Sequence, residues 1–422
     1  MPKSARTSAS KSASTTSGSR RVRTLKPSAR LSSAVKAGID LAALKVAPNG
    51  TAVILPETIQ PTAPAARPKP VRREQLSATR IMPKVTRDDL EARVQELIAL
   101  QGSHRDDDLI EDMIITSLKL VLDGTPRGEL KIMAAALREL RYAFKTFLPY
   151  RDIRKISIFG SARTPPQAPE FKQAHAFAEE MVRRGYMVIT GAGPGIMEAA
   201  NGGAGRERSF GVNIRLPFEQ SANPVIQGDK KLISFRYFFT RKLCFVKEAS
   251  AIALFPGGFG THDEGYEALT LVQTGKSTII PIVFIDRPEG TYWREWAEYV
   301  AEHLLGKGLI SPEDMNLFKV TDDYQWAAEE IAAFYRRYHS SRFVKDKLVI
   351  RLLTPLPAGA LERIRTKFAS ILAPGDGAFQ TSAALPEEMD QPELTPLPRL
   401  TFPFNRRDFG KLRLLIDEIN RA

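Results

Sequence analysis

The sequence predicts an α/β protein in which helices cover both faces of a doubly wound parallel sheet. Two observations support this prediction. From Lys155 onward, short apolar runs alternate with stretches of helical spacing, which is typical of parallel strands buried on both faces. Three of these runs end in turns rich in glycine, and in open parallel sheets ligands bind at the carboxyl ends of the strands.

The first 85 residues differ in composition from the rest of the 422-residue chain. Residues 1–80 contain 15 Lys and Arg against three acidic residues, so they carry 12 of the 13 net positive charges. Since this segment is rich in Ser, Ala and Pro and lacks sustained periodicity, we expect residues 1–85 to form a disordered basic tail. A solvated tail is the simplest interpretation. Weak contact with nucleic acid or another polyanion, and a role as a transit peptide, are the alternatives.

Residues 86–150 predict three amphipathic helices that pack against the domain that follows. The first begins with Thr86 and two acidic residues, which suit the positive end of a helix. The second ends at a glycine and the third ends before Pro149, as helices commonly do. None of the three expected helices carries a side chain whose position suggests catalysis or ligand binding.

Residues 151–340 carry the alternating pattern and predict a Rossmann-like domain. Strands are expected at 155–160, 187–193, 209–214, 251–256 and 277–286. Helices are expected at 169–185, 195–205, 232–249, 291–305 and 324–338, with a further one from Thr261. Residues 345–422 follow the order strand, helix, strand, strand, helix, which predicts a small α+β module of a kind often used for dimerisation or ligand sensing.

Glycine-bearing turns end three of the expected strands. The first turn contains Ser161 and Arg163, the second contains Gly191 and Gly193, and the third is PGGFGT at 256–261. A glycine turn that leads into a helix presents bare backbone N–H groups and a positive dipole end, where a phosphate binds. A single turn of this kind often only reverses the chain. Three of them at strand ends favour a nucleotide pocket.

The second turn is a poor dinucleotide fingerprint. Ile196 stands where the third glycine of that motif should be, and the next strand runs into Arg215 rather than an acid that could hold a ribose. NAD and FAD are therefore not favoured, and no cofactor is expected. Five scattered histidines and one cysteine, Cys244, predict no metal site.

Glu264 follows the third turn and has two interpretations from the residues alone. With Thr261 as the N-cap of the helix, Glu264 would complete a capping box three positions later. The alternative is a catalytic carboxylate beside the phosphate-binding turn. Local sequence does not separate these interpretations.

Four segments resemble the Lonely guy (LOG) family over residues 150–310: FGSAR, ITGAGPGIMEAAN, FFTRKLCF, and PGGFGTHDE followed by GYEALTLVQTGK. The resemblance implies a phosphoribohydrolase that cleaves nucleoside 5′-monophosphates, including cytokinin nucleotides, to free base and ribose 5-phosphate. The flanking segments resemble the longer bacterial members, some of which are general nucleotide nucleosidases. Members have often been labelled lysine decarboxylases, but no lysine here has a recognisable pyridoxal phosphate context.

The resemblance also implies roles for particular residues. Arg241 and Glu264 correspond to the catalytic pair. From their positions alone, Ser161, Arg163 and Asn201 are weaker candidates for lining the pocket, and His262 could reach the substrate or be structural. The candidate substrate-binding residues are Gly257, Gly258, Gly260, Thr261, Glu267, Lys242, Gly191, Gly193, Ser161 and Arg163. His262-Asp263 departs from the pair that most members carry before the last Glu, which affects the surroundings of the base.

We therefore expect an enzyme that hydrolyses the N-glycosidic bond of nucleoside monophosphates. The alternative is a non-catalytic nucleotide or cofactor carrier with the same pocket, and a nucleic-acid-binding protein would rest on the basic tail alone. The resemblance implies a homodimer or larger homo-oligomer. The lone cysteine and the absence of an apolar run of about 20 residues suggest a cytoplasmic protein without a membrane partner.

Overall fold

The computed structural model describes residues 44–46, 52–54, 86–102, 104–215 and 221–422. The chain divides into two compact units, Met1–Val85 and Thr86–Ala422. In the first unit, β1 (Leu44–Val46) and β2 (Ala52–Ile54) form an antiparallel pair. Apart from these strands, the expected disordered tail lies outside the described residues.

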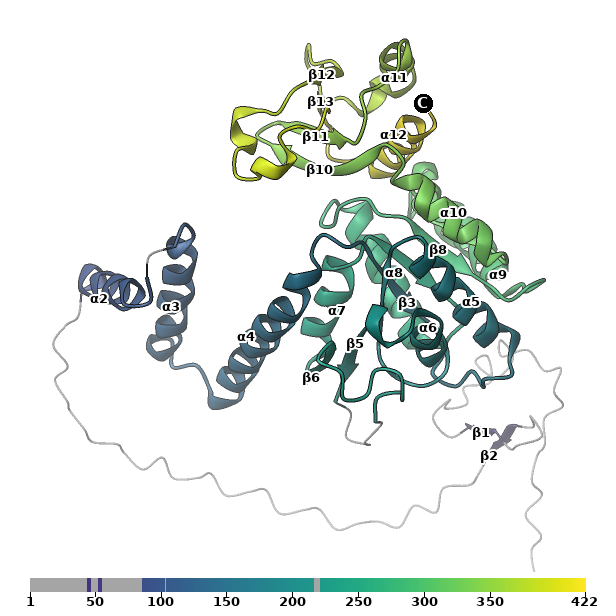
Figure 1. Cartoon of the computed structure of the whole chain (residues 1–422), viewed down its shortest axis with the longest axis horizontal. Coiled ribbons are helices and arrows are strands. Elements are labelled where there is room, and N and C mark those ends of the chain that lie inside the picture. The colour runs from purple at the N-terminus through teal and green to yellow at the C-terminus, as the bar shows by residue number, and fades with distance from the viewer. Residues whose placement is uncertain (1–43, 47–51, 55–85, 103, 216–220) are drawn as a thin grey trace, which may run out of the picture. The chain divides into compact units, whose positions relative to one another are not determined.

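The second unit is built on a seven-stranded parallel sheet, which confirms the predicted fold class (Figure 1). Its strand order is β6-β5-β4-β3-β7-β8-β9. The strands are β3 (Lys155–Phe159), β4 (Met187–Thr190), β5 (Ser209–Ile214), β6 (Leu232–Phe235), β7 (Ala251–Leu254), β8 (Ile282–Ile285) and β9 (Lys319–Thr321). The chain builds outward from β3 to β6 on one side and then returns to place β7 on the other side of β3. This reversal is the topological switch point of the sheet.

Helices cover both faces because alternate strand residues point to opposite sides. In β8, Ile282 and Phe284 belong to one apolar core, whereas Val283 and Ile285 belong to the other. One face is covered by α5 (Pro169–Arg183), α6 (Ile196–Ala204) and α10 (Tyr324–Phe334). The other is covered by α4 (Arg127–Phe147), α7 (Phe238–Lys247), α8 (Phe259–Gln273) and α9 (Tyr292–Tyr299).

The three N-terminal helices form as the sequence predicts. Thr86 caps α2 (Arg87–Ala99) in a capping box with Asp89. This helix packs on α3 (Asp107–Leu122), and α4 packs on α7 and β6. Within the described residues, no helix is both long and apolar enough to cross a membrane.

The C-terminal module is a four-stranded antiparallel sheet with two helices. Its strand order is β10-β11-β13-β12. The elements are β10 (Tyr338–Val344), β11 (Lys347–Leu352), α11 (Ala360–Phe368), β12 (Gln380–Ser382), β13 (Arg399–Pro403) and α12 (Phe409–Arg421). Phe409 packs against Gly275, so α12 lies on the end of α8. The module thus shares an apolar core with one face of the parallel sheet.

Three strands differ from the sequence prediction. The helix expected at 232–249 is wrong in its first part, because Leu232–Phe235 pairs with β5 as β6 and only Phe238–Lys247 is helical. Pairing with a neighbouring strand outweighs local helical spacing here. Edge strand β9 and strand β10 were not expected either. The helix expected at 324–338 ends at Phe334, and the chain enters β10 at Tyr338.

Candidate functional site

A cavity of about 800 Å³ lies at the switch point, where the carboxyl ends of β3, β4 and β7 meet. Each of the three glycine-bearing turns contributes to its lining. Ser161 N–H donates to the Pro256 carbonyl at 3.1 Å, and Ile196 N–H donates to the Ser161 carbonyl at 3.0 Å. The first turn is therefore tied by backbone hydrogen bonds to the third turn and to the start of α6. Ser161, Arg163 and Gly191 all line the cavity.

Gly257 is required by the packing of the protein itself, whereas Gly191 lies against the ends of flexible side chains. A Cβ at Gly257 would lie 2.1 Å from Thr261 Oγ1, and a Cβ at Gly191 would lie 2.6 Å from Arg241 Nη2. Gly258 and Gly260 differ, because a Cβ at either position would meet no protein atom within 4 Å. Both line the cavity. The space beside them is open to a ligand.

The start of α8 corrects the prediction for Thr261. The helix begins at Phe259 with Gly258 as its N-cap, and no side chain caps it. The expected capping box between Thr261 and Glu264 is wrong, because the glycine-rich segment already has helical conformation. Within the described chain, the N–H groups of Gly258, Phe259 and Gly260 find no acceptor, which leaves the donors expected at a helix N-terminus open toward the cavity.

Arg241 lines the cavity from α7. Its Nε donates to the carbonyl of Val212 within β5 at 3.0 Å, and its guanidinium carbon lies 5.1 Å from the centre of the Phe245 ring. Burial lowers the pKa of Arg241, and nearby Glu264 opposes that shift. The guanidinium is thus held in place at one edge while its Nη2 lies beside Gly191.

Glu264 lines the same cavity from the first turns of α8, with its residue surface 8% exposed. Burial raises the pKa of Glu264 to about 7, against the lowering effects of Lys242 and Arg241. Among the described residues, its carboxylate accepts no hydrogen bond, and Lys242 Nζ lies 3.9 Å away. With capping excluded, Glu264 is available for chemistry near neutral pH.

Lys242 lies behind Glu264 rather than in the cavity. Its Nζ is 2.8 Å from Asp263 Oδ2, 2.8 Å from Glu267 Oε2 and 3.9 Å from Glu264 Oε2. Burial opposes the charge of Lys242, but Asp263 and Glu267 outweigh it and raise the pKa of the lysine. Glu267, one turn after Glu264, likewise stays outside the cavity lining.

Two other predicted residues lie outside the cavity lining and take part in hydrogen bonds that hold the second turn in place. Gly193 is not part of the cavity lining, and its carbonyl accepts a hydrogen bond from Asn223 Nδ2 at 3.1 Å. Asn201 is fully buried, and its Oδ1 accepts from Thr190 Oγ1 at 2.7 Å and from Asn223 Nδ2 at 3.0 Å. Asn201 therefore shapes the turn without reaching a ligand.

Sequence reasoning did not identify Tyr292, which lines the cavity from the start of α9. Its O–H donates to the Gly257 carbonyl, so His262 Nε2, 2.7 Å from the same oxygen, must be the donor in that second bond. Burial lowers the pKa of His262, which favours the neutral ring. Phe238 and Phe259 also line the cavity and were not expected. No local signal marks Tyr292, because its role depends on the packing of α9 near the third turn.

Within the part of the chain that the structure describes, no group of three or more His, Cys, Asp and Glu side chains is arranged to hold a metal ion. The chemistry available in the cavity is a carboxylate, a guanidinium and the open N–H groups of α8.

A family model described as "Possible lysine decarboxylase" matches residues 196–331, a range that contains Arg241 and Glu264. No curated protein matches the chain. Among solved structures, a molybdenum cofactor binding protein from the bacterium Rippkaea orientalis is 19% identical, over 43% of this chain and 96% of that one, with a TM-score of 0.30. The molybdenum cofactor carrier protein of Chlamydomonas reinhardtii is 20% identical over 43% and 96%, with a TM-score of 0.31. DNA processing protein A from Helicobacter pylori is 13% identical over 44% and 83%, with a TM-score of 0.30.

Proposed function

We propose that the protein hydrolyses the N-glycosidic bond of nucleoside 5′-monophosphates and releases the free base and ribose 5-phosphate. The observation that carries this proposal is the position of Glu264. It is a buried carboxylate whose pKa is raised to about 7, and it lines one cavity with the open N–H groups at the start of α8. The cavity thus pairs an anion-binding element with a group suited to acid–base chemistry.

The start of α8 would hold the 5′-phosphate. Backbone N–H groups at a helix N-terminus, together with the helix dipole, favour a phosphate dianion. Gly258 and Gly260 allow the phosphate to approach the backbone closely, because neither position carries a side chain into the cavity. The phosphate contacts lie away from the bond that breaks, so their binding energy can hold the ribose in position for the reaction.

Glu264 would act on water at the anomeric carbon. As the C1′–N bond breaks, its electron pair moves to the base nitrogen and the ribose gains oxocarbenium character. The Glu264 carboxylate stabilises that positive charge and accepts a proton from the attacking water, whose oxygen forms the new bond to C1′. The proton then passes to the departing base or to solvent. Arg241, held beside Gly191, would orient the substrate through its free guanidinium nitrogens.

The name of the matching family model suggests a different reaction, decarboxylation of lysine. A lysine that forms a Schiff base with a cofactor needs a lowered pKa. Lys242 is the lysine nearest to Glu264 in the site described above, and its ion pairs with Asp263 and Glu267 raise its pKa. Its surroundings favour a structural cation, so we do not assign it that role.

The proposal is tested by incubating the protein with AMP, GMP, CMP and isopentenyladenosine monophosphate and measuring base and ribose 5-phosphate by chromatography. We expect equal amounts of both products from at least one substrate, and much slower cleavage of the matching nucleoside, which lacks the phosphate. Absence of ribose 5-phosphate from all four would overturn the proposal. An unchanged nucleotide or cofactor that co-purifies with such an inactive protein would support the carrier function instead.

A further inference from the structure

A second cavity, of about 980 Å³, lies at the amino ends of the parallel strands, opposite the ends that carry the glycine turns. Its lining includes residues directly before the strands: Arg154 precedes β3, Tyr186 precedes β4, Arg208 precedes β5 and Ser250 precedes β7. Because the strands are parallel, this end of the sheet is the one away from the glycine turns. The five residues of β3 alone span roughly 17 Å. The two cavities are therefore separate sites.

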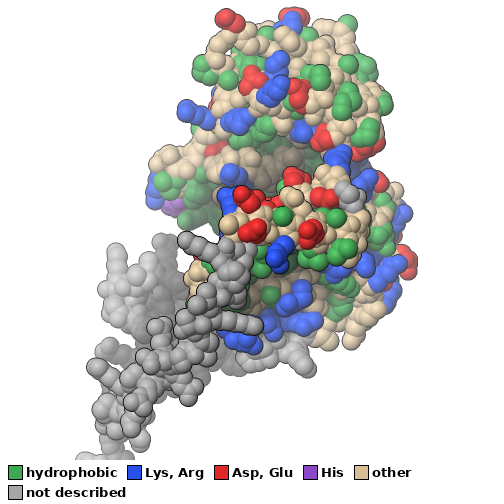
Figure 2. Space-filling view, turned by 90° about the vertical axis from the view of Figure 1, so that its left-hand side faces the viewer, with side chains coloured by type: hydrophobic (Ala, Val, Ile, Leu, Met, Phe, Trp, Pro, Cys, Tyr) green, Lys and Arg blue, Asp and Glu red, His purple; other side chains and the backbone are tan. Residues whose placement is uncertain are grey.

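The C-terminal module supplies the facing wall. Residues 338–341 of β10 and residues 391, 393 and 394 line the cavity. The module is fixed to the parallel-sheet domain nearby, because Arg413 Nη2 of α12 lies 2.8 Å from Glu330 Oε1 of α10. In Figure 2 the surface is hollowed beneath the module, which forms the upper part of the view. A ligand in this cavity would contact both the parallel-sheet domain and the C-terminal module.

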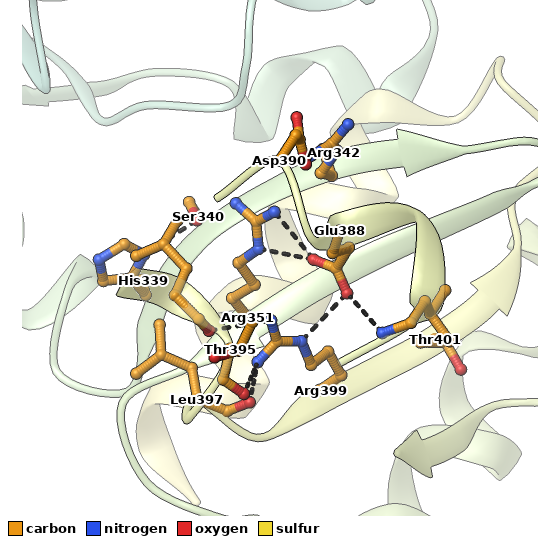
Figure 3. Close-up of polar contacts among 12 residues, drawn as sticks. His339, Ser340, Arg342, Arg351, Glu388, Asp390, Thr395, Leu397, Arg399 and Thr401 are labelled. Atoms are coloured by element: carbon orange, nitrogen blue, oxygen red, sulfur yellow. Dashed lines mark hydrogen bonds and ion pairs between the residues drawn. The ribbon is translucent and has the colours of Figure 1, made fainter. Parts of the chain in front are cut away.

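A buried ionic cluster holds the module's side of the cavity in shape (Figure 3). Glu388 is fully buried, with Oε1 2.8 Å from Arg351 Nε and Oε2 3.2 Å from Arg399 Nε. Arg399 also donates to the Leu394 carbonyl at 2.9 Å, which fixes the segment that faces the sheet. One carboxylate shared by two guanidiniums leaves a net positive charge behind this wall.

The cavity lining is basic. It contains six Lys and Arg and three acidic residues: Arg151, Arg154, Lys155, Arg184, Arg208, Lys247, Asp152, Glu248 and Glu393. Several of these charges are paired with each other or with neighbours, such as Lys247 with Glu248 at 2.7 Å. Within the described residues, Arg154 and Arg208 have no carboxylate partner. No acid of the described chain neutralises either guanidinium, so both can bind an anion, although one face of Arg154 packs on the Tyr335 ring, with its guanidinium carbon 4.2 Å from the ring centre.

Two buried polar atoms at the cavity lack a partner in the described structure. They are the hydroxyl of Tyr186, a residue that is 4% exposed, and Oε1 of Gln391 in the facing wall. An unsatisfied buried polar group is costly unless a ligand or water pairs with it. The tyrosine hydroxyl can donate to an anionic oxygen, and the amide oxygen can accept from a hydroxyl. This pair suits a ligand with both phosphate and sugar hydroxyl groups.

We propose that this cavity binds a phosphorylated sugar, either free or as part of a nucleotide, at a site separate from the candidate active site. Its volume falls within the range of roughly 300–1,000 Å³ that is typical of small-molecule sites. Arg154 and Arg208 bind the phosphate, and the Tyr186 hydroxyl and the Gln391 amide oxygen contact the phosphate and the sugar. This inference does not depend on the proposed hydrolysis.

Histidines provide a separate reporter for each cavity, since His262 lines the first and His339 lines the second. Burial lowers the pKa of His339, and Arg154, Arg351 and Arg399 add to that shift. An anion bound beside Arg154 should offset this positive field and raise the pKa of His339. The chain has five histidines, so ring-labelled histidine can be followed by NMR, with signals assigned through His262→Gln and His339→Gln.

The full-length protein is titrated with ATP, ribose 5-phosphate and inorganic phosphate as probes. We expect ATP or ribose 5-phosphate to shift the His339 signal and raise its pKa, with an apparent affinity at least tenfold above that of inorganic phosphate. An equal effect of both organic probes would identify the sugar phosphate as sufficient, and an effect of ATP alone would identify a nucleotide. We expect Arg208→Gln to weaken the His339 response at least tenfold, and we expect the same of the double variant Arg154→Gln with Arg208→Gln. Both variants should leave the His262 response unchanged.

The control Arg363→Gln removes the same charge from an exposed residue of the module outside the cavity lining, and it should change neither response. The proposal is overturned if no probe moves the His339 signal, if inorganic phosphate acts as strongly as the organic probes, or if Arg363→Gln weakens binding as much as Arg208→Gln. Because His262 reports the other cavity, these outcomes stay distinguishable from a failure of the proposed hydrolysis.

Discussion

The ammonium nitrogen of Lys242 lies 3.9 Å from a carboxylate oxygen of Glu264. This separation is too long for a hydrogen bond, but it is short enough for a substantial charge interaction in a buried setting. Burial raises the pKa of Glu264 and Lys242 partly offsets that effect, so their balance sets the carboxyl near pKa 7. Lys242 therefore tunes Glu264 without occupying the cavity.

The pH dependence of activity should report this balance. Glu264 must be ionised to stabilise the oxocarbenium ion, and its raised pKa of about 7 means that it is mostly protonated at pH 6. We expect kcat/KM to rise with pH, about tenfold per unit below the midpoint near 7. Lys242→Met removes the nearest lowering charge, so it should move this midpoint to higher pH. A midpoint below 5 in the wild type, or a shift to lower pH in the variant, would contradict this account.

The third turn offers a matched pair of glycine substitutions. Gly258→Ala places a methyl group where no protein atom lies within 4 Å, so the thermal midpoint should stay within a few degrees of the wild type. The same methyl group enters the space assigned to the phosphate, and KM for AMP should rise at least tenfold. Gly257→Ala places its Cβ 2.1 Å from Thr261 Oγ1, so it should lower the free energy of unfolding by about 1–3 kcal/mol. Calorimetry and steady-state kinetics measure both effects. Unchanged KM in Gly258→Ala would argue against a phosphate at this turn.

Tyr292→Phe tests the role of a residue that the sequence did not reveal. The substitution keeps the ring and removes the O–H that donates to the Gly257 carbonyl and accepts from His262. We expect kcat/KM to fall several-fold, mainly through KM, because the phosphate-binding turn loses a tether. A fall in kcat alone would instead place Tyr292 at the reacting atoms. His262→Gln, which keeps a donor at the end of the side chain, serves as the control and should have a smaller effect.

An apolar surface on α4 and α7 leads us to expect a homodimer. Leu137, Phe239 and Leu243 are 54%, 55% and 47% exposed, and Glu139 joins the two helices by accepting from Thr240 Oγ1 at 2.8 Å. Light scattering should give twice the chain mass for the wild type and one chain mass for Leu137→Glu combined with Phe239→Glu. The control Leu309→Glu changes another exposed leucine, 70% exposed, and should stay dimeric. A monomeric wild type at micromolar concentration would refute this expectation.

The sequence was sufficient for the parallel sheet but not for all of its strands. The central strands are continuous apolar runs, a pattern that depends only on burial between helix layers. In the C-terminal sheet β10 was also missed, although its partner β11 follows directly after residues 345–346, and β6 was missed because its strand character depends on pairing with β5. Local spacing cannot represent such pairing.

The candidate site was predicted only in part, again because local motifs do not show which distant residues come into contact. Arg241 and Glu264 lie in segments with local motifs, and the structure brings both to one cavity. The capping role of Thr261 was wrong because the glycines were assigned to a turn, whereas α8 already begins at Phe259. Tyr292 and the second cavity could not be predicted, since each depends on residues brought together from distant parts of the chain.

The most direct test of the proposed function is the release of ribose 5-phosphate from AMP, or from the best substrate of the panel, by Glu264→Gln. This variant keeps the shape of the side chain and removes the carboxylate. We expect kcat to fall about 10²–10⁴-fold, while nucleotide affinity measured by calorimetry stays within about threefold, because the phosphate is held by the start of α8. Activity close to that of the wild type in Glu264→Gln would contradict the account.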